Sequence, residues 1–291
     1  MSERRQLINL AYRLLGSLAD AEDVVQETYA RWYAMPAAQQ ETIGSPGAWL
    51  TRVAGRICLD QLRSARSRRE RYVGEWIPEP LPDRTGLGGR PGAATADPGD
   101  QVTLDESISM AFLVVLESMT PAERVAFILH DVFRYSFAEV AEIVGRTPAA
   151  CRQLASSARR RLPAASAPAP PTAQQAGLVR AFKHAWATAD INALIDLLAP
   201  DATAIGDGGG RVRAALEPVR GAEQVARFFA GRAGAMPGMI VLERTVNGRP
   251  GLVVRLTGGT VSVMAFDIAG ARITHIWAVL NPDKLRLWTA D

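Results

Sequence analysis

The strongest constraint on the fold lies in residues 120–162, where helix start and stop signals follow one another closely. Twice in this stretch a serine or threonine precedes a glutamate by three positions, which is the capping-box pattern of a helix N-terminus. A glycine then suits the left-handed residue that ends a helix, and Thr-Pro starts the next one at once. The spacing predicts a helix-turn-helix with a turn of about three residues. Its helices are Ser136–Val144 and Pro148–Leu162.

The second of these helices has two distinct faces. Its apolar stripe recurs at steps of four, three and four residues and is rich in alanine, which allows close packing. Five arginines and no acid lie between positions 146 and 161. A small helical hairpin with a solvated basic end would share these features, but caps, turn and charge together favour DNA binding. The stripe consists of Cys151, Ala155, Ala158 and Leu162.

Length and composition indicate a globular protein of two or three domains, because the chain has 291 residues with 48% hydrophobic and 22% charged residues. The longest apolar run, Met110–Leu116, is too short to cross a bilayer, and the N-terminus lacks the apolar core of a signal peptide. We therefore expect a cytoplasmic protein without membrane contact. Cys58 and Cys151 lie in separate helical patterns, which favours two buried thiols over a disulfide. Three histidines without a cluster predict no metal, and nothing predicts a cofactor.

Changes in composition divide the chain. Two helical regions are separated by a segment rich in proline and glycine, and a proline-rich segment follows the second. The last region begins with helical patterns and continues with four strand-like runs separated by turn signals, the first of them Asn247-Gly248, which predicts an α+β domain with consecutive antiparallel strands. The predicted parts are 1–75, 76–100, 101–162, 163–175 and 176–291. The predicted strands are Met239–Val246, Gly251–Leu256, Thr260–Asp267 and Arg272–Leu280.

A second basic stretch lies in residues 52–71, with seven arginines against two acids. Trp49 precedes it, and Tyr72 and Trp76 follow it. Arginines interleaved with aromatic rings suit a track for unpaired bases, although a solvated helix end would show the same charge.

Three segments in order resemble one family, the bacterial RNA polymerase sigma factors of the extracytoplasmic-function group (group IV of the sigma-70 family). The first two read DAEDVVQETYARWY at 20–33 and PGAWLTRVAGRICLDQLRSARSRR at 46–69, and the third is the helix-turn-helix. The resemblance implies two all-α sigma domains, σ2 and σ4, that bind the clamp helices and flap of core RNA polymerase together with promoter DNA. Arg56 and Leu154 depart from the residues common in the family, which leaves the base preference open.

The resemblance assigns three sets of site residues. The polymerase surface comprises Asp20, Asp23, Val24, Gln26, Glu27, Tyr29 and Trp32. The surface for the −10 element comprises Trp49, Arg52, Arg56, Asp60, Arg63 and Arg66. The surface for the −35 element comprises Arg146, Thr147, Ala149, Arg152, Gln153, Ser156, Arg159 and Arg160.

The remaining sequence resembles the SigJ-like subgroup, whose C-terminal domain has the cone-shaped SnoaL/NTF2-like α+β fold. The marks are WIPEPLP at 76–82, DGGGR at 207–211 and NPDKL at 281–285. The resemblance implies that this domain contacts the linker and regulates the two sigma domains, and it leaves open a small-molecule ligand. The implied contacts are Trp76, Pro78, Leu81, Asp207, Gly208, Gly209, Asn281, Pro282, Asp283 and Lys284.

Two alternative functions remain at this point. The first is a one-component regulator in which a ligand-binding domain drives a DNA-binding domain, but it leaves residues 1–75 unexplained. The second is a SnoaL-like enzyme fused to a DNA-binding domain. Because no spacing pairs an acid with a base, we expect no catalysis. The candidate catalytic residues of such an enzyme are His184, Asp207, Asp267 and His275.

Overall fold

The computed structural model describes residues 3–69, 72–85, 106–162, 172–215, 217–233, 238–256 and 259–289. Much of the two predicted linkers, and the side chain of Arg66, lie outside the described residues. The chain divides into two compact units, one helical and one α+β. The helical unit comprises Met1–Glu70, Gly89–Ile108 and Phe112–Pro163, and the α+β unit comprises Arg71–Gly88, Ser109–Ala111 and Ala164–Asp291.

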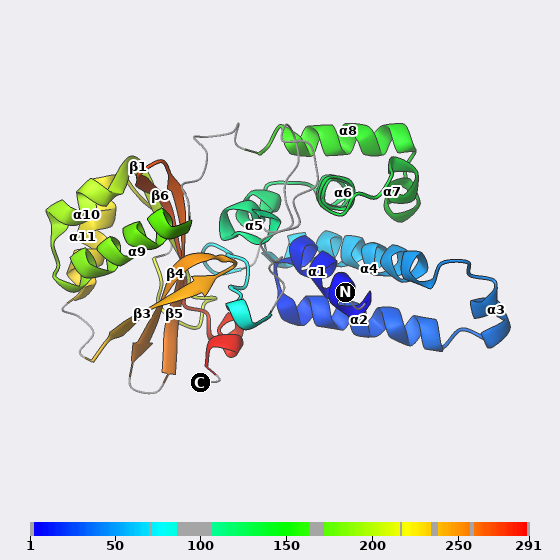
Figure 1. Cartoon of the computed structure of the whole chain (residues 1–291), viewed down its shortest axis with the longest axis horizontal. Helices are drawn as coiled ribbons and strands as arrows, with labels where there is room; N and C mark the ends of the chain where they lie inside the picture. The colour runs from blue at the N-terminus through cyan, green and yellow to red at the C-terminus, as the bar shows by residue number, and fades with distance from the viewer. Residues whose placement is uncertain are drawn as a thin grey trace. The chain divides into compact units, whose positions relative to one another are not determined.

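The first half of the helical unit is a bundle in which α1, α2 and α4 pack side by side (Figure 1). Ser17 caps α2 by accepting a hydrogen bond from the backbone N–H of Asp20. Apolar residues at helical spacing, such as Leu10, Leu14 and Val24, are almost fully buried between the helices. The helices are α1 (Glu3–Leu15), α2 (Leu18–Tyr33), the short α3 (Ala37–Glu41) and α4 (Pro46–Arg69).

The second half holds the helix-turn-helix, and its local signals are confirmed. Capping boxes form at Thr120 and Ser136, and Gly145 has a φ of 70° in the left-handed region. The small side chains of the predicted stripe are buried, Cys151 among them, and burial raises the pKa of its thiol. The elements are the 3₁₀ turn η2 (Glu106–Ile108), α5 (Met110–Glu117), α6 (Pro121–Phe127), the π-helix η3 (Ile128–Val132), α7 (Phe137–Val144) and α8 (Pro148–Arg159).

The α+β unit is a six-stranded sheet with helices α9, α10 and α11 on one face (Figure 1). The strand order is β2-β1-β6-β5-β4-β3, and the β1–β6 pair is parallel whereas the other pairs are antiparallel. The strands are β1 (Leu198–Asp207), β2 (Val219–Arg220), β3 (Ile240–Val246), β4 (Arg249–Leu256), β5 (Gly259–Ala269) and β6 (Arg272–Val279). The helices are α9 (Thr172–Ala187), α10 (Ile191–Leu197) and α11 (Ala222–Ala233), and the 3₁₀ turns are η1 (Asp83–Thr85), η4 (Pro282–Lys284) and η5 (Arg286–Trp288).

The sheet differs from the sequence prediction at one edge, where β1 and the short β2 were not predicted. The four predicted strands correspond to β3–β6, and β1 makes the sheet mixed instead of antiparallel. Its sequence, LAPDATAIGD, contains few β-branched residues. The strand forms because its backbone pairs with β6, a partner distant in sequence, so a local pattern could not reveal it.

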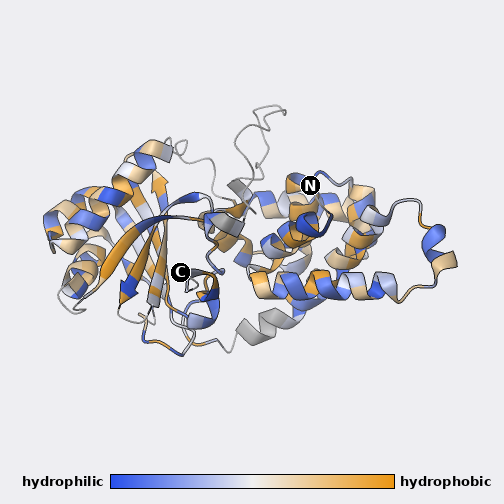
Figure 2. Cartoon of the chain, turned by 60° about the horizontal axis from the view of Figure 1, so that its bottom comes forward, coloured by the Kyte–Doolittle hydropathy of each residue, from blue (hydrophilic) through white to orange (hydrophobic). Residues whose placement is uncertain are grey.

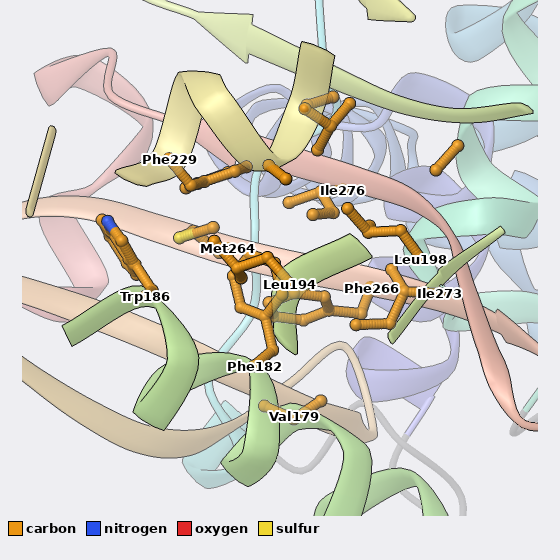
Figure 3. Packing of buried hydrophobic residues seen from close by; sticks show 14 of the residues in the cluster. Val179, Phe182, Trp186, Leu194, Leu198, Phe229, Met264, Phe266, Ile273 and Ile276 are labelled. Atoms are coloured by element: carbon orange, nitrogen blue, oxygen red, sulfur yellow. The ribbon is translucent and has the colours of Figure 1, made fainter. Parts of the chain in front are cut away.

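Aromatic side chains fill the space between the sheet and its helices. Figure 2 shows the strands mainly hydrophobic, and Figure 3 shows the rings converging from α9, α11 and β5. The ring of Phe182 lies 5.1 Å from that of Phe229 and 5.4 Å from that of Phe266, and Trp186 lies 5.3 Å from Phe229. These edge-to-face contacts pack the rings against one another between the sheet and the helices.

Candidate nucleic-acid interface and linker-docking site

Helix α8 presents a polar face to solvent. Thr147 caps it, accepting a hydrogen bond from the backbone N–H of Ala150 at 3.2 Å. The buried alanine stripe holds the helix against α6 and α7, so the opposite residues are directed outward. All predicted −35 residues are exposed except Ser156, which is half-buried.

The arginines of α8 are not equivalent. Arg159 donates to the largely buried carboxylate of Asp131 at 2.7 Å, so its charge is already paired within the unit. Arg160 donates to Ser156 at 3.5 Å. Within the described part of the chain, Arg146 and Arg152 form no ion pair, and their charges are therefore available to an anionic partner.

The predicted −10 surface of α4 packs against α7. Arg52 pairs with the carboxylate of Glu142 at 2.8 Å, and Arg56 donates to the backbone carbonyl of the same residue at 2.8 Å. Between them, a Cβ added at Gly55 would lie 2.8 Å from Cγ2 of Ile143, so only glycine permits this close approach. The first helix of the helix-turn-helix thus covers part of the arginine stripe.

The other residues predicted for the −10 surface lie around this contact. Arg63 pairs with Asp60 at 3.3 Å on the exposed side of α4. The ring of Trp49 meets that of Trp32 edge to face at 5.2 Å, which joins the predicted −10 and polymerase surfaces.

The predicted polymerase surface of α2 has four exposed polar residues, whereas Tyr29 and Trp32 are half-buried and Val24 is buried. Val24 is fully buried, so it belongs to the helical core and not to the surface. Tyr29 stacks on Tyr33 at 6.1 Å, and the Tyr33 side chain is 74% exposed. Tyr33 was not predicted, although it ends the same aromatic segment. The exposed members of the predicted set are Asp20, Asp23, Gln26 and Glu27, the last paired with Arg31.

Two buried arginines join the halves of the helical unit. Arg13, 1% exposed, donates to Ser107 at 2.7 Å and lies over the ring of Phe133 at 5.8 Å. Arg124, 3% exposed, donates to the carbonyl of Leu14 at 3.0 Å and to Glu117 at 2.8 Å. Sequence reasoning missed both, because an arginine inside an amphipathic pattern gives no local sign of burial.

In the α+β unit, Asp207 anchors the segment that was predicted to begin the linker. It ends β1 and is fully buried. Its Oδ1 accepts hydrogen bonds from the Tyr72 hydroxyl at 2.6 Å and the backbone N–H of Gly209 at 3.0 Å. Its Oδ2 accepts from the backbone N–H of Ile77 at 3.0 Å and from Nζ of Lys284 at 2.6 Å. One carboxylate therefore connects the linker, the glycine turn and the C-terminal turn.

Neighbouring side chains complete this site. Burial, together with the hydrogen bond to Asp207, raises the pKa of Tyr72, so its hydroxyl remains a donor. Nδ2 of Asn281 donates to the same hydroxyl at 2.9 Å. The ammonium of Lys284 lies 4.2 Å from the centre of the Trp76 ring, within cation–π range.

The far end of the docked segment is held by residues that were not predicted. The backbone N–H of Leu81 donates to Oδ1 of Asn247, and the backbone N–H of Asn247 donates to the carbonyl of Leu81, both at 2.9 Å. Nε1 of Trp288 donates to the carbonyl of Pro80 at 2.9 Å. The sequence predicted Asn247 only as a hairpin residue, a role that its φ of 50° also satisfies.

The remaining predicted contacts differ in burial. Pro78 is buried along with Leu81. Gly208 and Gly209 pack so closely that an added Cβ would lie 2.0 Å from the Val212 carbonyl oxygen and 2.2 Å from Asn281 respectively. Pro282 begins η4, and Asp283 stays exposed, where it pairs with Arg211 at 3.0 Å.

The candidate catalytic residues do not converge on the interior. His184 is exposed on α9. Asp267 and His275 pair across β5 and β6 at 3.7 Å, and alternation along these strands places them on the face opposite Phe266 and Ile276 of the core. Burial acts to raise the pKa of Asp267, but hydrogen bonds from His275 and Thr274 outweigh it, so the pKa lies below its usual value.

No cluster of three metal-ligating side chains occurs among the residues that the structure describes. None of the helices in these ranges combines the length and apolar character that a membrane-spanning helix requires.

Comparisons with known proteins agree with this architecture. The chain matches the family models for Sigma-70 region 2 over residues 1–68, Sigma-70, region 4 over 109–162, and the SnoaL-like domain over 179–280. It is 40% identical to the ECF RNA polymerase sigma factor SigJ of Mycobacterium tuberculosis, covering 97% of this chain and 90% of that protein. It is 32% identical to the probable ECF RNA polymerase sigma factor SigI of the same species, covering 98% and 92%. The crystal structure of M. tuberculosis SigJ superposes with a TM-score of 0.74 at 33% identity, covering 97% of this chain and 95% of that one. Helical regions 2 and 4, a SnoaL-like domain and identity over nearly the whole length show that the chain belongs to the ECF RNA polymerase sigma factors.

Proposed function

We propose that the chain directs core RNA polymerase to specific promoters in the cytoplasm through three surfaces of its helical unit. The acidic and aromatic face of α2 binds core polymerase. The arginine-rich face of α4 meets the −10 element, and α8 enters the major groove at the −35 element. The observation that carries the proposal is the exposed, unpaired charge of Arg146 and Arg152 at the start of a capped recognition helix.

The contact between α4 and α7 adds a condition to this proposal. Arg52 and Arg56 bind Glu142 in the structure, so they reach DNA phosphates only when that contact is exchanged. The exchange is between exposed groups, for which an ion pair contributes at most about 1 kcal/mol. Exchange of this ion pair is therefore inexpensive, and DNA competes effectively for the arginines.

We further propose that the α+β unit modulates initiation and has no enzymatic activity of its own. The docked segment around Asp207 supports modulation, because it belongs to the chain that connects the two predicted DNA-binding regions. The packed aromatic interior and the outward position of Asp267 and His275 argue against a catalytic pocket.

The test is transcription in vitro by core polymerase with the full chain across a promoter library. The wild-type chain should select a promoter class, and Asp23→Lys combined with Glu27→Lys should abolish transcription and co-purification with core polymerase. Asp196→Lys combined with Asp201→Lys makes the same charge change on exposed residues of the α+β unit and should not. Undiminished polymerase binding by the α2 variant would refute the surface.

A further inference from the structure

Arg152, a member of the predicted −35 surface, has a partner that the sequence did not indicate. Its guanidinium lies over the ring of Phe137, with Cζ 5.3 Å from the ring centre. Phe137 is the first residue of α7, directly after the cap Ser136, so its backbone position is fixed by the capping box. The ring of one helix of the motif therefore contacts the side chain that projects from the other.

The ring of Phe137 is itself held in place. It stacks on the imidazole of His130, with ring centres 3.8 Å apart and planes inclined by 24°. Nδ1 of His130 lies 2.8 Å from the backbone carbonyl of Tyr135, and because a carbonyl only accepts, this nitrogen carries the hydrogen and donates it. His130 belongs to the π-helix η3, an element that often marks functional positions.

We infer that Phe137 is a positioning residue for Arg152, and that the stack from His130 through Phe137 orients the guanidinium before DNA arrives. A free arginine side chain loses rotamer freedom when it binds a base, and a preformed contact reduces that loss. An aromatic face also suits the flat, delocalised guanidinium while leaving its N–H donors at the edge available to guanine. This inference rests on the proposed function, because it assigns a role within the −35 surface.

Arg159 and Arg152 of α8 are oriented by different kinds of partner. Arg159 is oriented by the carboxylate of Asp131, which neutralises it. Arg152 is oriented by a neutral ring, which keeps its charge available and holds its direction without competing for its hydrogen bonds. Only the contact with the ring, at Arg152, leaves an arginine able to bind a base.

The experiment uses holoenzyme assembled from core RNA polymerase and the full chain, with double-stranded promoter fragments randomised across the −35 element as the probe. Phe137→Met removes the ring at similar volume, and Phe137→Tyr keeps it. Phe112→Leu removes a ring from α5, where Phe112 packs on Phe127 at 6.0 Å, and serves as the matched control. Arg152→Ala identifies the base pair that Arg152 reads.

We expect Phe137→Met to reduce the preference at the base pair identified with Arg152→Ala by about two- to fivefold, the effect of one exposed cation–π contact. Phe137→Tyr and Phe112→Leu should retain the wild-type preference. An unchanged preference in Phe137→Met, a loss shared equally by all sequences, or failure of Phe137→Tyr to retain it would each overturn the inference while the sigma function stands. If Arg152→Ala itself keeps every preference, the premise fails. If the wild-type holoenzyme initiates nowhere, the proposed function fails with it.

Discussion

Replacing Asp207 with asparagine tests whether its carboxylate holds the docked linker segment. The amide has nearly the same shape, but it carries no charge and turns one acceptor oxygen into a donor. If the nitrogen takes the place of Oδ2, it faces the backbone N–H of Ile77 and the ammonium of Lys284, which are both donors. If it takes the place of Oδ1, it faces the N–H of Gly209 and the Tyr72 hydroxyl. Either orientation loses hydrogen bonds and leaves the lysine without its counter-charge.

The structure sets the size of this effect. Asp207 is fully buried and the side chain of Lys284 is 12% exposed, so solvent compensates little for the lost ion pair. Removing one partner of a buried pair costs about 3–5 kcal/mol. Since about 1.4 kcal/mol corresponds to a factor of ten, local opening of the segment should become more frequent by about two to three and a half orders of magnitude.

Hydrogen exchange of the full chain, read at the amide of Ile77, measures that opening directly. The amide is protected in the wild type by its bond to Oδ2 of Asp207, and the variant should exchange faster by the factor above. Asp283→Asn is the matched control, because it makes the same change in a carboxylate whose side chain is 44% exposed and should alter exchange little. Exchange at Ile77 within about threefold of the wild-type rate in Asp207→Asn would refute this account of docking.

Three further predictions concern other contacts. Asn247→Gly keeps the positive φ but removes the acceptor for the amide of Leu81. The free energy of local opening at that amide should fall by the cost of one unsatisfied buried group, about 1–3 kcal/mol, and hydrogen exchange there should become correspondingly faster. Ser136→Ala should destabilise the helical unit by about 1 kcal/mol at pH 7 in urea unfolding. The Ser136 hydroxyl holds the pKa of Glu139 below its usual value. A carboxyl group with a lowered pKa stabilises the folded state at pH values above its unfolded pKa, and this stabilisation is lost as the pH falls through its folded pKa. The difference between this variant and the wild type should therefore shrink in acid, and a constant difference would contradict it. Arg160→Ala should weaken binding to all promoter sequences alike and reduce the salt slope by about one unit, and a changed base preference would contradict its role as a phosphate contact.

The sequence revealed the elements whose cause is local. Capping boxes, the glycine at the end of α7 and alternating strands with turn residues all act within a few positions, and each occurs where it was predicted. Strand β1 depends on a partner distant in the chain, so no local pattern marked it, and the π-helix η3 was not predicted either.

The same distinction applies to the site. Exposure of Arg152 follows from the helical period, but its contact with Phe137 requires the relative placement of two helices. Asn247 was recognisable as a turn residue, whereas its pairing with Leu81 joins positions 166 residues apart. Val24 was wrongly assigned to a surface because the resemblance identified the helix without resolving which of its residues face the core.

Docking of the segment 72–85 has a consequence for tether length. The −10 and −35 elements lie about 25 base pairs apart, or about 85 Å along B-DNA. With 72–85 docked and η2 (Glu106–Ile108) held in the helical unit, the chain between them, residues 86–105, has 20 residues and reaches about 66–72 Å at full extension. Release of the docked residues would add 14 residues to the free chain, a contour length of about 45–50 Å. The effective concentration of one DNA-binding region at the second element depends on how well tether length matches the span. If the α+β unit modulates initiation as proposed, it would act through this short docked segment on the usable length of chain, and it would need no contact with DNA.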